Sequence, residues 1–153
     1  MRVLLIITAA IVSLASCEST PRSVADEIGT ITLNADDGVA FATGEIVPGD
    51  KFNQVDLLAT ENGDRLRLAT GGPTTTKPNP IIWFETAGGM LETYSSLDEV
   101  PYDKPTSDTG AAMLKTETGL GFVLQNYTSS GFTKGWIRSA TASEVVIEYE
   151  IFE

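Results

Sequence analysis

Short runs in which every second residue is apolar recur from about residue 28 to the C-terminus, and turn-forming residues separate them. A period of two places apolar side chains on one face of a β-strand, whereas almost nothing here follows the period of a helix. Roughly eight such runs occur, at a spacing typical of all-β domains. The pattern therefore predicts one domain over residues 28–153, an antiparallel β-sandwich or a partly closed barrel.

The clearest strand covers residues 144–151. Its expected buried face carries four side chains, Val145, Ile147, Tyr149 and Ile151. Glu148 and Glu150 alternate with them, and acidic residues on the other face are typical of a solvated strand or an edge strand.

Residues 55–60 and 65–70 predict a hairpin. An Asn-Gly pair is a strong signal for a two-residue turn, so Asn62-Gly63 is expected to connect the strands and to pair Leu57 with Leu68. The face predicted to be buried carries Val55, Leu57, Ala59, Leu66 and Leu68.

The opposite face of this hairpin is expected to be solvated. In the same register Asp56 lies diagonally across from Arg67, which predicts a surface ion pair of little energetic weight. A slip of one residue would exchange the two faces of the hairpin.

Turn-forming residues predict the connections between the strands. Asp36-Asp37-Gly38 favours a hairpin turn; a calcium loop is the alternative, but such loops supply more oxygen ligands at alternating positions. Residues 71–80 and 101–110 predict long loops because they are rich in proline. Ser96–Glu99 fits the capping box at the start of a helix, and Pro101 limits that helix to about one turn. Tyr127–Phe132 indicates a wider loop between two further strands.

The first residues of the chain have a different pattern. Arg2 precedes an apolar stretch at 3–14, which is shorter than the roughly 20 residues that span a bilayer. This combination is typical of a signal peptide. The sequence that follows it, Leu14-Ala15-Ser16-Cys17, resembles the lipobox of bacterial lipoproteins.

The resemblance covers residues 1–17 and implies a localisation and a membrane anchor rather than an activity. It implies that residues 1–16 are removed as a signal peptide and that the Cys17 thiol accepts a diacylglyceryl group. Two or more acyl chains give stable anchoring. Glu18 and Ser19 follow the cysteine, where an aspartate would favour the inner membrane, so the resemblance implies the outer membrane, facing the periplasm or the cell surface. Residues 17–27 are then the lipidated cysteine and a polar, flexible tether.

Composition narrows the function classes. The chain carries ten basic and 21 acidic residues, a net charge of −11. Arg2 is the only charge in residues 1–16, so residues 17–153 retain nine basic residues and a net charge of −12. Such acidity disfavours nucleic acid as a partner, because phosphate contacts require clustered lysine and arginine.

The chain contains no histidine and one cysteine, Cys17. The absence of histidine excludes Ser/His/Asp and Cys/His catalysis, haem held by histidine, and the usual histidine-bearing zinc sites. Acid/base catalysis by a pair of carboxylates is harder to exclude, because 21 acidic residues allow two of them to meet in a cleft. Several of these residues stand next to glycine, asparagine or proline, which indicates turns and solubility instead. We therefore expect no enzyme, no metal site and no cofactor. A single cysteine also excludes a disulfide within the chain.

Three aromatic residues are candidate ligand-binding residues: Tyr127, Phe132 and Trp136. The first two flank a loop whose rings and hydroxyls suit a sugar or a peptide, although such rings more often fold back over the end of a sandwich. Trp136 and Trp83 lie on predicted strands, where a tryptophan is more often part of the core. The loop at 71–80 could meet an anion through Thr74–Lys77, but no helix follows to form a phosphate site.

We therefore expect a membrane-anchored envelope lipoprotein whose β domain is an interaction module for a protein or a surface polymer. The alternative is a binder of a small ligand or a glycan, as some β-rich bacterial surface lipoproteins capture haem or glycans. A ligand binder should contain a concave apolar pocket with a few converging polar groups. An interaction module should present a flat exposed patch or an unblocked edge strand.

Overall fold

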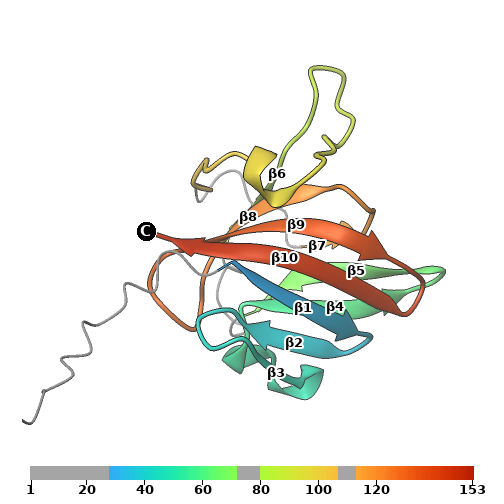
Figure 1. Ribbon diagram of the computed structural model, residues 1–153. Helices are drawn as coiled ribbons and strands as arrows, with labels where there is room; N and C mark the ends of the chain where they lie inside the picture. Colours follow the sequence, from blue (N-terminus) through green and yellow to red (C-terminus); the bar gives the residue numbers. More distant parts are fainter. Residues whose placement is uncertain (1–27, 72–79, 107–112) are drawn as a thin grey trace, which may run out of the picture.

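The computed structural model describes residues 28–71, 80–106 and 113–153. Two antiparallel five-stranded sheets pack face to face and do not close into a barrel (Figure 1). The predicted all-β class and the sandwich architecture are confirmed. The described residues form ten strands, rather than about eight. The predicted signal peptide, Cys17 and the tether lie outside the described residues, as does Thr74–Lys77.

The first sheet, sheet A, contains the two ends of the domain. Its strands lie in the order β1 (Gly29–Asn34), β10 (Glu144–Phe152), β9 (Phe132–Ala140), β8 (Gly121–Gln125) and β6 (Ile81–Trp83). The second sheet, sheet B, has the order β3 (Glu45–Pro48), β2 (Asp37–Ala40), β4 (Leu57–Asn62), β5 (Arg65–Thr70) and β7 (Met113–Lys115). Two short 3₁₀ segments, η2 (Gly49–Gln54) and η3 (Leu97–Glu99), lie in the connections.

The core fills the space between the two sheets, because each strand turns its alternate apolar side chains inward. Sheet A contributes Leu33, Phe122, Leu124, Ile137, Val145 and Ile147, and sheet B contributes Val39, Leu57, Ala59, Leu66 and Leu68. Each fully buried Leu, Ile, Val or Phe side chain stabilises the fold by roughly 1.5–3 kcal/mol.

Part of the outer face of sheet A is covered as well. Val123 and Lys134 point away from the core, yet both are buried. A Cβ on Gly121 would approach Tyr94 and Val100 to 2.8 Å, so the connection between β6 and β7 packs closely on this face. The short η3 turn lies within this connection, where the Ser96–Glu99 pattern predicts a turn, but the Ser96 side chain makes no capping hydrogen bond (Figure 1).

The predicted strand at residues 144–151 is present as β10, with Val145, Ile147 and Tyr149 buried. It is not an edge strand, because β1 and β9 pair with it on either side. Its glutamates reflect a solvated face instead.

The predicted hairpin is present as β4 and β5, and its buried face is confirmed. Its register is wrong by two residues: Leu57 pairs with Thr70, and Asn62 pairs with Arg65. The turn is Gly63-Asp64, in which Gly63 has a φ of 71°. Glycine at the first turn position accounts for the shift, and a slip of two residues leaves each side chain on its predicted face.

The turn after β1 is not a hairpin turn. β1 and β2 follow one another in sequence, but β1 pairs with β10 in sheet A and β2 pairs with β3 and β4 in sheet B. Asp36 adopts a φ of 65°, and the carboxylate of Asp37 accepts from the backbone and side-chain nitrogens of Asn34 at 2.8 and 3.0 Å. The chain thus crosses here from one sheet to the other.

Candidate functional site

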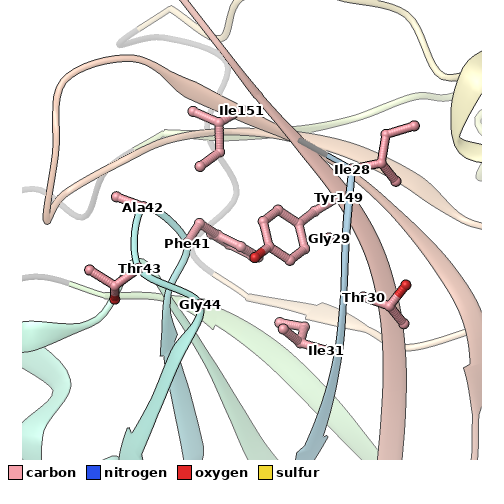
Figure 2. A pocket seen from close by; sticks show the side chains of 10 residues that line it. All are labelled: Ile28, Gly29, Thr30, Ile31, Phe41, Ala42, Thr43, Gly44, Tyr149 and Ile151. Atoms are coloured by element: carbon pink, nitrogen blue, oxygen red, sulfur yellow. The ribbon is translucent and has the colours of Figure 1, made fainter. Parts of the chain in front are cut away.

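A pocket opens at one end of the sandwich, between the first half of β1 and the turn Phe41–Gly44 that connects β2 to β3. We call it the seam pocket, and its volume is about 350 Å³. Figure 2 shows the rings of Phe41 and Tyr149 at its centre, with Ile28 and Ile151 on either side. All the residues that line it carry uncharged side chains. The pocket therefore suits a neutral group, and it offers no ion-pair partner.

Two aromatic rings form the floor of the seam pocket. Phe41 and Tyr149 are both buried, and their ring centroids lie 4.8 Å apart at an interplanar angle of 55°. Gly29 pairs with Tyr149 in the β-ladder, and a Cβ at this glycine would overlap the tyrosine ring. Glycine is therefore required here if the ring is to lie against β1.

The buried carboxylate of Asp56 fixes the backbone of Phe41, one of the two floor residues. Asp56 has no exposed surface, and its Oδ2 accepts from the backbone N–H of Phe41 at 2.8 Å. Its Oδ1 accepts from the backbone N–H groups of Tyr127 and Thr128 at 2.6 and 2.7 Å, and the Thr128 hydroxyl donates to Oδ2 at 2.8 Å. Four donors thus compensate the cost of burying the charge.

This arrangement corrects the expectation that Asp56 lies on the solvent face opposite Arg67. Strand β4 begins only at Leu57, so Val55, Asp56 and Leu57 do not alternate but are all buried. The carboxylate points inward because backbone donors from two distant segments meet there. Asp56 therefore acts as a positioning residue: it connects the floor of the seam pocket with the loop between β8 and β9.

The three aromatic candidates do not form one site. Tyr127 lies on the loop held by Asp56, and the residue is 40% exposed. Phe132, at the start of β9, stacks on Phe152 with centroids 5.6 Å apart, and Lys104 Nζ lies 5.0 Å from its ring centroid.

The two tryptophans differ in their surroundings. Trp136 is half-buried on the outer face of sheet A, where its Nε1 donates to the backbone carbonyl of Tyr94 at 3.0 Å. It therefore binds the connection between β6 and β7 to sheet A. Trp83 packs on the core, 5.3 Å from the ring of Phe122, which confirms the expectation for that residue.

A buried ion pair lies beside Phe152 on the same outer face. Lys134 Nζ is 3.1 Å from Glu150 Oε2 and 3.7 Å from the ring centroid of Tyr102, whose hydroxyl donates to the same carboxylate at 2.8 Å. The cluster therefore connects Tyr102, in the segment between β6 and β7, to β9 and β10.

A second hollow, of about 460 Å³, lies at the opposite end of β10, between the turn at Asp64 and the turn at Thr141. Its wall includes the ion pair between Arg65 and Glu117, both about half exposed. It lacks the aromatic floor of the seam pocket. Among residues 28–71, 80–106 and 113–153, no group of three or more acidic, cysteine or histidine side chains could hold a metal ion.

No family model, curated protein sequence or solved structure matches this chain. Within the described part of the chain, no helix is long and apolar enough to cross a membrane.

Proposed function

We propose that this protein is a membrane-anchored lipoprotein of the bacterial cell envelope, and that its β domain is an interaction module for a protein or a surface polymer. The proposed role as an interaction module rests on the exposed loop at Tyr127, which the buried carboxylate of Asp56 holds in one conformation. A loop held in one conformation loses little entropy on binding. Tyrosine is also enriched among the residues that dominate binding energy at interfaces.

The anchoring rests on the lipobox-like sequence that ends at Cys17. Residues 18–27 would connect the lipid to the domain, and ten residues reach at most about 35 Å when extended. β1 begins at Gly29 beside the seam pocket, so this end of the sandwich stays close to the anchor. The proposed partner is therefore a component of the membrane or of the adjacent envelope.

The test is site-specific photo-cross-linking in cells, with a photoreactive phenylalanine analogue at position 127. Position 143 is the matched control, because Ser143 is exposed in the turn at the opposite end of β9. We expect a defined adduct from position 127 and none from position 143. We also expect the Asp56→Asn variant to lose the adduct. Equal labelling from both positions, or none from either, would contradict the proposal.

The seam pocket favours a second candidate function, the binding of a small uncharged ligand. Its volume is near the lower end of the range for small-molecule sites, and its floor is aromatic. A thermal-shift screen of the protein against uncharged glycans, with haem and metal ions as charged comparison compounds, separates the two candidates. We expect no large shift; stabilisation by several degrees with one compound class would favour the ligand binder.

A further inference from the structure

The four edge strands of the sandwich differ in how well they are protected. Natural sheets protect exposed edges by short length, charged residues or proline. β6 and β7 have three residues each, and β7 ends in Lys115. β3 has four residues and contains Glu45 and Pro48. β1 has six residues, Gly29–Asn34, and contains neither a charge nor a proline, so it is the least protected edge in the described part of the chain.

The backbone of β1 also has groups directed toward its open side. Asn34 N–H donates to the carboxylate of Asp37 and therefore points away from β10. In an antiparallel ladder, N–H groups two residues apart point the same way. The N–H groups of Thr30 and Thr32 consequently face the side of β1 that no described strand covers.

The seam pocket lies directly beside this edge, because Gly29, Thr30 and Ile31 form one of its walls (Figure 2). In a strand added to β1, alternate side chains would point into the space between the sheets. They would enter the seam pocket above Phe41 and Tyr149. The intervening side chains would lie on the outer face, beside Thr30 and Thr32, which are both exposed.

The charge next to this outer face is negative. Thr30 pairs with Glu148 and Asn34 pairs with Glu144 on β10. A strand added to β1 would lie about 10 Å from β10, since neighbouring strands are about 4.8 Å apart. That separation slightly exceeds the screening length of about 8 Å at physiological salt, so the attraction is reduced there and is larger at low salt. Arg138 pairs with Glu148 at 3.1 Å, but the net charge of −12 for residues 17–153 still favours a cationic partner.

We infer that the edge of β1 binds an extended segment of a partner protein, with apolar side chains in the seam pocket and lysine or arginine on the outer face. The inference rests on the proposed function and names the partner class for that end of the sandwich. The main chain supplies affinity through hydrogen bonds to Thr30 and Thr32, and the pocket supplies specificity, as in other cases of strand addition.

The test uses the full chain in detergent micelles and a synthetic peptide of alternating valine and lysine with blocked ends. Amide hydrogen exchange is the main readout. We expect the peptide to slow exchange at Thr30 and Thr32 at least tenfold. An otherwise identical peptide with glutamate in place of lysine should bind at least tenfold more weakly, and added salt should narrow this difference.

Two variants separate the edge from the pocket. Thr32→Pro removes one outward N–H but no ladder hydrogen bond to β10, and it should weaken peptide binding at least tenfold. Ala42→Trp, on the exposed rim of the seam pocket, should weaken binding several-fold by filling the pocket. Ser143→Trp, at the far end of the sandwich, is the control and should bind like the wild type. Thermal unfolding of each variant checks that the fold persists.

Unchanged exchange at Thr30 and Thr32, or equal affinity in Thr32→Pro, would overturn the inference. Slow exchange of both amides without peptide would also overturn it, because the edge of β1 would then already be occupied. Dimers in sedimentation would identify the occupant as a second copy of the chain. Loss of the protection in Val24→Pro would identify it as the preceding segment of the same chain. If cross-links form at position 127 but persist in Thr32→Pro, the inference fails and the proposed function stands. If no cross-links form at position 127, the proposed function fails, whether or not the peptide binds to β1.

Discussion

The carboxylate of Asp56 accepts hydrogen bonds from residues 15, 71 and 72 positions away in the chain. Asp56→Asn would replace one acceptor oxygen by a donor that faces other donors. Leaving buried donors without partners costs about 1–3 kcal/mol each. We expect Asp56→Asn to lower the free energy of unfolding by about 3 kcal/mol, measured by urea denaturation.

Thr128→Val is the matched control for this prediction. It removes only the hydroxyl that donates to Oδ2 and keeps the backbone donors. Its cost should be about 1 kcal/mol. Similar stability of Asp56→Asn and the wild type would mean that the carboxylate does not hold the loop.

The phenol of Tyr94 is favoured in its neutral form by its surroundings. Burial, and then the hydrogen bond to Glu92 and the charge of that carboxylate, raise the pKa of Tyr94 to about 12 from the usual 10.0. The neutral phenol is favoured in the fold, so this contribution to stability is complete below pH 10 and is lost as the pH rises through about 12.

An absorbance titration of tyrosinate checks this prediction. We expect a late step near pH 12 that disappears in Tyr94→Phe and moves to lower pH in Glu92→Gln. A step that persists in Tyr94→Phe would assign the raised pKa to another tyrosine.

At the scale of elements, the contact between β8 and β9 depends on a glycine. A Cβ at Gly135 would overlap the ring of Phe122, which is fully buried and packs against Trp83. Overpacking of a core costs about 1–3 kcal/mol. We expect Gly135→Ala to destabilise the domain by this amount in thermal or urea unfolding.

Gly88→Ala provides the comparison, because the nearest atom to its Cβ would be 3.9 Å away. It should change stability by less than about 0.5 kcal/mol. Adding Phe122→Leu to Gly135→Ala should recover part of the loss. If the two alanine variants were equally stable, the ring would not be fixed against the glycine.

Hydrophobic alternation was sufficient to predict most of the strands, because the inward face of each strand repeats every second residue. It predicted the buried faces of β4, β5 and β10 correctly. It could not predict that β1 and β2 join different sheets, because a two-residue turn permits either a hairpin or a crossing. It also placed the turn between β4 and β5 at Asn62-Gly63 instead of Gly63-Asp64. A tight turn needs a residue with positive φ, but a glycine in the sequence does not show whether it is the first or the second residue of the turn.

The candidate site was less predictable than the fold. Tyr127 and Phe132 were found as aromatic residues at a loop, and this loop does lie at one end of the sandwich. The seam pocket was missed because it needs Phe41 and Tyr149 to meet across two sheets. Asp56 was missed for a similar reason, although an acidic residue between Val55 and Leu57 is a signal that a buried acceptor could be present.

At the scale of the whole molecule, the proposed anchor makes a prediction about Cys17. Replacing it with serine removes the thiol that would accept the lipid. We expect the Cys17→Ser protein to incorporate no radiolabelled fatty acid and to leave the membrane fraction or remain unprocessed. Ser16→Ala, which keeps a small residue before the cysteine, should still be labelled. Continued labelling of Cys17→Ser would contradict the proposed anchor.

The pairing of β1 with β10 joins the first strand of the domain to the last. During synthesis β1 emerges before β10, so its partner in sheet A is available only when residues 144–152 have been made. Contacts this distant in sequence form slowly. In a chain exported as we propose, the domain would remain unfolded while it crosses the membrane, the state in which a narrow translocation channel can accept it. The domain would complete its fold only after β10 has been delivered to the envelope.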